Sequence, residues 1–360
     1  AHELFAAPTS GLGRVRTASS PVRRVAVWMC QLMPNPSLSP TDAKTTYLES
    51  RQTDLRESTL KTHHYRLKHL VRWCDLNGVT DISTLTRPQI DQYANWRRDD
   101  GELSKASMKG QMDTLRVFLK FLERVGAVEP DLHEAVPSVT MSPSDERNDR
   151  IVPAEEAREI LETLDRYHYA SVRHIWFLLA WRTSARISSL RALDVSDYDA
   201  DEQYIYYRER DGTQLKNGTQ GERPVALSGE TCTVLDDYLA QNRTEVTDQY
   251  GRDPFVSSPH GRVHRNTMRR WSYQLTCPSF VGESTDCDCN QNSNQAYRCD
   301  HSVSPHGIRR GSITHFLREG LPEKVVSDRA NVSEDVIDKH YDSRSEMDKM
   351  NQRRGHLNNL

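Results

Sequence analysis

Two short motifs in this sequence can bind a phosphodiester. His306 and Arg309 are three residues apart, so on one helical turn both side chains can reach the same phosphate. A second arginine, Arg186, lies far upstream between two apolar stretches. Guanidinium groups stay charged and offer a planar fork of donors that matches phosphate oxygens. The two arginines therefore suit a site that stabilises the extra negative charge of a five-coordinate phosphorus.

A tyrosine follows these motifs near the C-terminus. Tyr341 ends a helix-like run that includes Asp338, Lys339 and His340. A phenol is mostly neutral at pH 7, so it attacks phosphorus only when its proton is removed and the phosphate is polarised. The alternative is that Tyr341 merely packs, as most of the 14 tyrosines must. Its position after the two cationic motifs favours a nucleophile.

The order of these residues resembles the tyrosine recombinases of the phage integrase family. The segment from Thr183 to Leu190 is similar to the family's Thr-Gly-x-Arg-x-Ser-Glu-Leu box, and Arg186 matches its arginine. His306 and Arg309 match the family's His-x-x-Arg. The pattern is of the XerC/XerD kind and looks closest to archaeal integrases.

The resemblance covers residues 45–345, is strongest over 150–345, and implies a site-specific DNA recombinase or integrase of the kind found in mobile elements. It implies that Tyr341 forms a covalent 3′-phosphotyrosyl bond and releases a 5′-hydroxyl. Because that bond conserves the energy of the phosphodiester, religation needs neither ATP nor another catalytic cofactor.

Lys216 and Asn331 complete the catalytic set that the resemblance implies. In the family, a lysine on the loop between two strands donates a proton to the leaving 5′-oxygen. Lys216 matches this lysine, in a loop similar to the family's Gly-Lys-Gly-x-Lys-x-Arg hairpin. Asn331 stands in the turn where many members carry His or Trp, and we expect it to donate a hydrogen bond to a phosphate oxygen. Ser189 stands where members commonly carry Glu or Asp.

Ser189 and Asn331 leave a second hypothesis open, a catalytically silent DNA-binding protein of the same fold. Single residues also have structural interpretations: Arg186 as a salt-bridging arginine, His306 as a core histidine and Lys216 as a solvated lysine. A metal-dependent nuclease is disfavoured, because no carboxylate cluster accompanies the His-x-x-Arg motif in the sequence.

Length and composition are compatible with this interpretation. A chain of 360 residues is long enough for two domains. Its formal net charge of -3 neither demands nor excludes nucleic acid, because DNA-binding proteins concentrate positive charge locally. No apolar run approaches the length of a membrane span. We therefore expect no membrane partner and a cytoplasmic, nucleoid-associated location.

The hydrophobic periodicity predicts a mainly α-helical protein with a small antiparallel β-sheet. Leu67, Leu70, Val71 and Cys74 follow helical spacing. Two strands are expected around 204–207 and 224–227. We expect a disordered lead-in (1–43), a helical, SAM-like core-binding domain (44–128), a linker (129–150), a tyrosine-recombinase catalytic domain (151–345) and a C-terminal tail (346–360).

Two groups of basic side chains are candidates for contact with the DNA backbone, although a charged helix face is often only solvated. They are Lys61, Arg66, Lys68 and Arg72 in the first domain and Arg262, Arg265, Arg269 and Arg270 in the second. The expected partner is double-stranded DNA. Recombination would need four protomers around two duplexes, so we expect a homotetramer on two DNA sites.

Four of the seven cysteines cluster in a polar insertion at 277–301: Cys277, Cys287, Cys289 and Cys299. Four thiolates can close a tetrahedral zinc site and order a loop that lacks a core. The spacing is not the strong Cys-x2-Cys pair, and His301 can replace one ligand. Structural zinc and reduced, unpaired thiols are equally compatible with this pattern.

Overall fold

The computed structural model describes residues 38–142, 150–282, 293–342 and 344–357. The chain divides into two compact units, Ala1–Glu146 and Arg147–Leu360, and each has its own hydrophobic core. Within the described residues, none of the helices combines the length and the apolar character that crossing a membrane requires.

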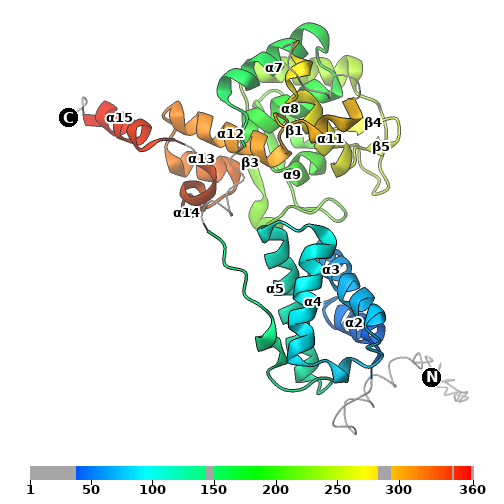
Figure 1. The fold of residues 1–360 in the computed structure, drawn as a ribbon. Helices are drawn as coiled ribbons and strands as arrows, with labels where there is room; N and C mark the ends of the chain where they lie inside the picture. Colours follow the sequence, from blue (N-terminus) through cyan, green and yellow to red (C-terminus); the bar gives the residue numbers. More distant parts are fainter. Residues whose placement is uncertain (1–37, 143–149, 283–292, 343, 358–360) are drawn as a thin grey trace, which may run out of the picture. The chain divides into compact units, whose positions relative to one another are not determined.

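The first unit is a small bundle of helices (Figure 1). Its main helices are α2 (Pro40–Ser50), α3 (Glu57–Leu76), α4 (Arg87–Gly101) and α5 (Lys105–Arg124). A short 3₁₀ turn, η1 (Ile82–Thr84), lies between α3 and α4, and a second, η2 (Leu132–Ala135), follows α5. The starts of α4 and α5 are visible in the sequence, because Thr86 and Gln89 form a capping box and Ser104 accepts a hydrogen bond from the Ser107 amide.

The limits of this unit differ from those predicted from the sequence. Helix α2 begins inside the expected lead-in, because Ser39 caps it and Ala43 is fully buried in the core. The expected linker also starts too early, since Leu132 and Val136 are buried in the same core. The Arg116 Nη2 donates to the carbonyl of Val136 at 3.0 Å. The rest of the expected lead-in, residues 1–37, lies outside the described residues, as do residues 143–149 of the expected linker.

The second unit begins with three helices and a small antiparallel sheet. The helices are α7 (Ala154–Tyr167), α8 (Val172–Thr183) and α9 (Ile187–Ala192). After the turn η3 (Val195–Asp197), the strands are β1 (Tyr198–Asp199), β2 (Tyr204–Tyr207) and β3 (Arg223–Ala226), in the order β1-β2-β3. Tyr204 pairs with Ala226 and Tyr207 with Arg223, so the loop between β2 and β3 projects from one end of the sheet.

The rest of the second unit is mostly helical. It contains α10 (Gly229–Asp237) with the π-helical turn η5 (Tyr238–Asn242), β4 (Ser257–Ser258), β5 (Gly261–Arg262), α11 (Arg265–Leu275), α12 (Pro305–Arg318), α13 (Glu323–Ala330), α14 (Glu334–Val336), the π-helical turn η9 (Ile337–Tyr341) and α15 (Glu346–Leu357). Within the expected insertion, the described parts are the turns η6 (Pro278–Phe280) and η8 (Ser293–Arg298). The expected polar tail is thus helical over most of its length.

Helix α8 is the centre of the second core. Ile175, Trp176, Phe177 and Leu179 are all fully buried, as expected for a helix that neighbours cover on all sides. Helices α7, α9, α10, α11 and α12 all contact it. Gly311 of α12 permits a close approach, because a Cβ there would lie 2.0 Å from the carbonyl oxygen of Val152, just before α7, and 3.2 Å from the Trp181 ring of α8. The close packing of α12 against α8 fixes where the side chains of α12 emerge.

Candidate active site

The arginine box forms the turn between α8 and α9. Ser184 ends α8 in the left-handed conformation, with a φ of 51°, and its hydroxyl is 2.6 Å from the hydroxyl of Ser312 on α12. This turn places Arg186 at the N-terminal cap of α9. The Arg186 Nη1 donates to the carbonyl of Asn331 at 2.9 Å. The box arginine is therefore held against the end of α13, 145 residues later in the chain.

Helix α12 buries Arg309 beside that turn. Its side chain is only 2% exposed, and its Nη1 donates to the carbonyls of Ser184 and, at 2.9 Å, Ala330. Burial, with the nearby charge of Arg186, lowers the pKa of Arg309 to about 10. In the described part of the chain, its Nε and Nη2 are buried and make no complete hydrogen bond, while the neighbouring Tyr341 side chain acts to raise the pKa of the guanidinium. Such donors are costly unless a ligand satisfies them, and a phosphate oxygen would do so.

Tyr341 contacts both residues of the His-x-x-Arg motif. The Arg309 guanidinium is 5.1 Å from the centre of the Tyr341 ring. The His306 ring meets the same ring edge-on, with 5.2 Å between the centres. The Thr314 hydroxyl donates to the Tyr341 carbonyl at 2.9 Å, which fixes the backbone of the tyrosine. Tyr341 is only 6% exposed, so the predicted nucleophile and the predicted cations form one cluster.

The electrostatics of this cluster keep His306 neutral. The imidazole has an exposed edge, but its partial burial lowers its pKa to about 4, and the charges of Arg309, Arg310, Arg186 and Lys216 act in the same direction. At neutral pH the ring can therefore accept a proton. A phosphate bound among the same cations would offset their repulsion and favour the protonated ring.

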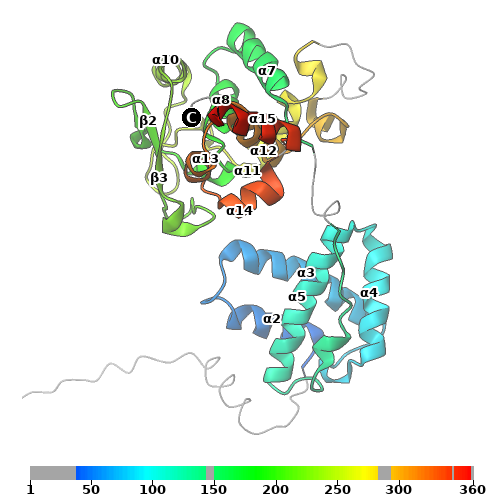
Figure 2. The same cartoon turned by 90° about the vertical axis from the view of Figure 1, so that its left-hand side faces the viewer.

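A groove of about 600 Å³ adjoins the cluster. It is lined by Arg186, by Lys216 on the β2–β3 loop and by Asn331 at the end of α13. Figure 2 shows the hairpin next to α13, and the Arg223 Nε on β3 donates to the Arg329 carbonyl on α13 at 2.8 Å. The structure thus brings Arg186, Lys216 and Asn331 to one groove, with Arg186 common to the groove and the cluster.

Asn331 is placed differently from the expectation. Both polar groups of its side chain are hydrogen-bonded to the β2–β3 loop, through Asn217 at 2.7 Å and Gln220 at 3.0 Å. Its hydrogen bonds therefore hold the protein together, whereas the sequence suggested contact with a phosphate. Ser189 is 4% exposed on α9 and provides no charge beside Arg186.

Arg223 is a cation that the sequence argument missed. It stacks on the ring of Tyr207 at 4.7 Å and lines the groove with Arg186. Burial lowers its pKa to about 10, with Arg186 and Arg329 acting in the same direction. A partial signal was present, since Arg223 ends the loop that contains Lys216, but it follows this lysine by seven residues, whereas the arginine of the family's hairpin motif follows the matched lysine by five.

Comparisons with known proteins agree with this geometry. Residues 150–344 match the phage integrase family, and residues 45–126 match the phage integrase N-terminal SAM-like domain. The chain belongs to the phage integrase family. Its membership of the tyrosine-type site-specific recombinases and its expected fold class are thereby confirmed.

Two relatives illustrate the family match. Tyrosine recombinase XerD of Mycobacterium tuberculosis is 23% identical over 285 residues, which are 75% of this chain and 82% of the relative. Tyrosine recombinase XerC of Oceanobacillus iheyensis is 23% identical over 297 residues, with 79% and 85% covered.

Two solved structures share the fold. The Tn1549 transposon integrase in complex with a circular intermediate DNA has a TM-score of 0.60 at 12% identity, covering 89% of this chain and 100% of the other. A lambda integrase tetramer bound to a Holliday junction has a TM-score of 0.59 at 16% identity, covering 88% and 82%.

In this integrase-family chain, the basic residues of α3 are only partly solvated. Lys68 is exposed, and Lys61 forms a 2.6 Å ion pair with Glu57 on the surface. Arg66 instead donates to the Thr114 hydroxyl of α5 at 3.0 Å. Arg72 lies over the Trp96 ring at 4.9 Å and pairs with an aspartate of α4. Arg66 and Arg72 therefore help to hold the bundle together.

Arg262 does not belong to an exposed basic surface. Its side chain is 3% exposed, and its Nε donates to Asp248 at 2.6 Å while its Nη2 pairs with Asp194. Its Nη1 donates to the carbonyls of Arg191 and Leu193 at 2.7 and 3.0 Å. Arg262 thus has a structural role, and its expected phosphate contact does not fit this burial. The other three basic residues of this group are exposed on α11: Arg265, Arg269 and Arg270.

Two of the four clustered cysteines are described. Cys277 and Cys299 are buried in one small cluster with Ala296. Cys287 and Cys289 lie outside the described residues. Two neighbouring thiols suit a thiophilic metal, and the zinc site remains a prediction from the sequence.

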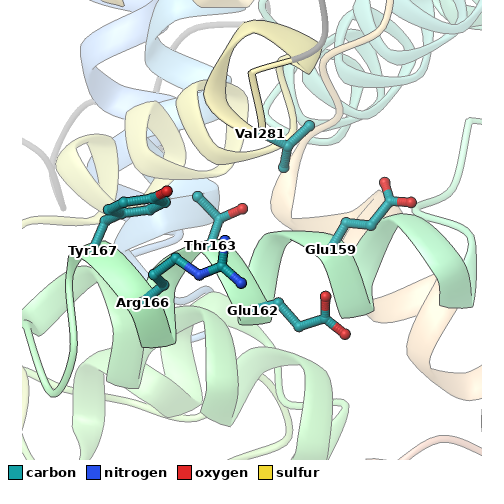
Figure 3. Close-up of a pocket in the computed structure, with 6 residues that line it drawn as sticks. All are labelled: Glu159, Glu162, Thr163, Arg166, Tyr167 and Val281. Carbon is teal, nitrogen blue, oxygen red and sulfur yellow. The ribbon is translucent and has the colours of Figure 1, made fainter.

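A second cavity of about 230 Å³ lies on α7 (Figure 3). Glu159 and Glu162 line it together with Arg166. The groove beside Arg186 also contains two carboxylates, but three cations line it against one here. The α7 cavity is therefore the poorer site for a phosphodiester.

We expect Arg262→Ala to lower the stability of the fold and Arg269→Ala to leave it nearly unchanged. Arg262→Ala removes the partner that Asp194 and Asp248 share, although both carboxylates keep a contact with Arg252. It should lower the free energy of unfolding by about 1–3 kcal/mol. Arg269→Ala on the exposed face of α11 should change it by less than about 0.5 kcal/mol. If Arg269 contacts a phosphate, its removal should reduce by about one the magnitude of the slope of log K for DNA binding against the logarithm of the salt concentration. Urea unfolding and DNA titration measure both quantities, and a stable Arg262→Ala protein would contradict the structural role.

The lowered pKa of His306 predicts a dependence of stability on pH. Its folded pKa of about 4 lies below the ordinary value of 6.5, so the unfolded state binds more protons between these values. Stability from this group is therefore present above pH 6.5 and is lost as the pH falls toward 4. The Tm of His306→Gln should fall less than that of the wild type over this range, by a small margin because the ring has an exposed edge. His260→Gln, in an exposed turn, is the control.

If the cysteine cluster binds zinc, purified protein should contain about one zinc per chain by elemental analysis. Cys277→Ser should lose it, while Cys74→Ala in the core of the first unit should retain it. Protein without zinc, in which all of the thiols react with a thiol reagent, would show that the cysteines are simply reduced.

Proposed function

We propose that this chain cuts and rejoins DNA strands at specific sites through a covalent 3′-phosphotyrosyl intermediate, without ATP. The observation that carries the proposal is the position of Tyr341, whose ring contacts both the buried guanidinium of Arg309 and the neutral imidazole of His306. Family membership and the shared fold support the same reaction class.

In the cleavage step, the Tyr341 oxygen attacks the phosphorus and the bond from phosphorus to the 5′-oxygen breaks. The phenolic proton passes to the neutral imidazole of His306. The donors of Arg309, with the guanidinium of Arg186, bind the non-bridging oxygens as their negative charge grows. Because these donors are already in place, little reorganisation accompanies the reaction.

The leaving 5′-oxygen receives both electrons of the broken bond and requires a proton. Lys216 lines the same groove as Arg186, and an ammonium group is a suitable proton donor to an alkoxide. Religation is the reverse: the 5′-hydroxyl attacks the phosphotyrosine, Lys216 takes back its proton and His306 returns the proton to Tyr341. No bond energy is lost in the cycle, so no nucleotide cofactor is needed.

The partners follow from this reaction. Double-stranded DNA is the substrate, and exchange between two duplexes requires four active sites, one for each strand. We therefore propose a homotetramer on two DNA sites, as in the lambda integrase structure described as a tetramer bound to a Holliday junction. Association with the nucleoid would follow from binding to chromosomal DNA.

A covalent-trapping assay tests the proposal. Wild-type protein, Tyr341→Phe and the control Tyr167→Phe are incubated with pools of nicked duplexes of random sequence in magnesium-free buffer. A nick just beyond the cleaved bond lets the short fragment that carries the new 5′-hydroxyl diffuse away, so the adduct is trapped. We expect an SDS-resistant protein–DNA adduct from the wild type and from Tyr167→Phe, and none from Tyr341→Phe.

The alternative function is a DNA-binding protein of the same fold that no longer cuts. Ser189 is the feature that favours it, because it removes a carboxylate that relatives place near the box arginine. Wild-type protein that retards its native DNA site but forms no adduct would establish this alternative and overturn the proposal.

A further inference from the structure

Asn331 occupies an unusual backbone conformation at the end of α13. Its φ is 51° and its ψ is 65°, which is the left-handed region that glycine adopts without cost and that asparagine tolerates better than most residues. A glycine would therefore cap this helix with less strain. An asparagine in place of glycine indicates that the side chain of this residue has a role of its own.

The residue makes three hydrogen bonds to two separate elements. Its carbonyl accepts from the Arg186 Nη1 at 2.9 Å. Its side-chain Oδ1 accepts from the Asn217 Nδ2 at 2.7 Å, and its Nδ2 donates to the Gln220 carbonyl at 3.0 Å. The backbone of Asn331 thus holds the box arginine, while its side chain holds the β2–β3 loop.

The first half of the loop has other anchors, since Arg252 donates to the Asp211 carbonyl at 3.2 Å and to the Thr213 hydroxyl at 3.1 Å. The Glu209 carboxylate accepts from the Leu215 amide at 2.5 Å, and the Glu222 carboxylate accepts from the Glu209 amide at 2.8 Å. Lys216 lies between this anchor at Leu215 and the contact of Asn217 with Asn331. Release of the second contact would remove the anchor on the C-terminal side of the lysine that lies nearest to it in the chain.

We infer that Asn331 is a positioning residue that holds the β2–β3 loop against α13, so that Lys216 is directed at the leaving 5′-oxygen. The inference rests on the proposed function. It replaces the expected phosphate contact of Asn331 with an action through Lys216, and it assigns Asn217 the same purpose. Loss of this contact should slow the transfer of the Lys216 proton and leave the binding of the phosphate by Arg186 and Arg309 in place.

Asn331→Gly is the informative variant. Glycine takes the left-handed conformation readily and retains the carbonyl that Arg186 contacts, so the variant removes only the side-chain amide. Asn217→Ala removes the main partner from the other side. Gln203→Gly is the matched control, because Gln203 is an exposed residue of the same unit with a positive φ of 54°.

The probe is the nicked duplex that the wild type captures from the random pool, synthesised with either oxygen or sulfur at the scissile 5′ position. A thiolate leaves without a proton, because thiols are far more acidic than alcohols. On the oxygen substrate, we expect Asn331→Gly and Asn217→Ala to form the adduct about 10-fold more slowly. On the sulfur substrate, both variants should form the adduct at a rate within about twofold of the wild type. The affinity of both variants for the DNA should be unchanged.

Equal loss of rate on both substrates would overturn the inference, since it would indicate a general structural role or a direct phosphate contact. A second measurement does not depend on cleavage. Amide hydrogen exchange over residues 215–221 should be faster in Asn331→Gly than in the wild type and in Gln203→Gly. Unchanged exchange would refute the positioning role even if the wild type formed no adduct, a result that would count separately against the proposed function.

Discussion

The burial of the Arg309 side chain is the constraint on which the rest of the second unit depends. A charged group is taken out of water with only part of its hydrogen-bonding capacity satisfied by backbone carbonyls, and this costs stability. The cost is offset by the apolar core around α8, against which α12 packs through Gly311. The fold thus supports an arrangement of like charges that would not persist on a flexible chain.

Much of this site could be read from the sequence because its main parts lie in short, ordered motifs. The turn from Thr183 to Arg186 and the helical spacing of His306 and Arg309 are local features, and the structure brings them together with Tyr341. Helix starts such as Thr86 and Ser104 were likewise visible, since caps use adjacent residues.

The features that the sequence did not reveal depend on distant contacts. Arg262 looked like part of a basic surface, because its partners Asp194 and Asp248 are far from it in the chain or separated by a loop. Leu132 and Val136 looked like a linker, because only the folded bundle shows the core that buries them. The role of Asn331 depends on a loop more than a hundred residues upstream.

The position of Tyr341 also has a genetic consequence. Arg186, His306, Arg309 and Tyr341 of a single polypeptide meet in one cluster, and the Thr314 hydroxyl holds the tyrosine backbone in place. If the chain cleaves DNA as proposed and each tyrosine acts within its own protomer, two defective alleles, one lacking the tyrosine and the other lacking an arginine, cannot restore a working centre by mixing. Such a pair would fail to complement in a cell that carries both.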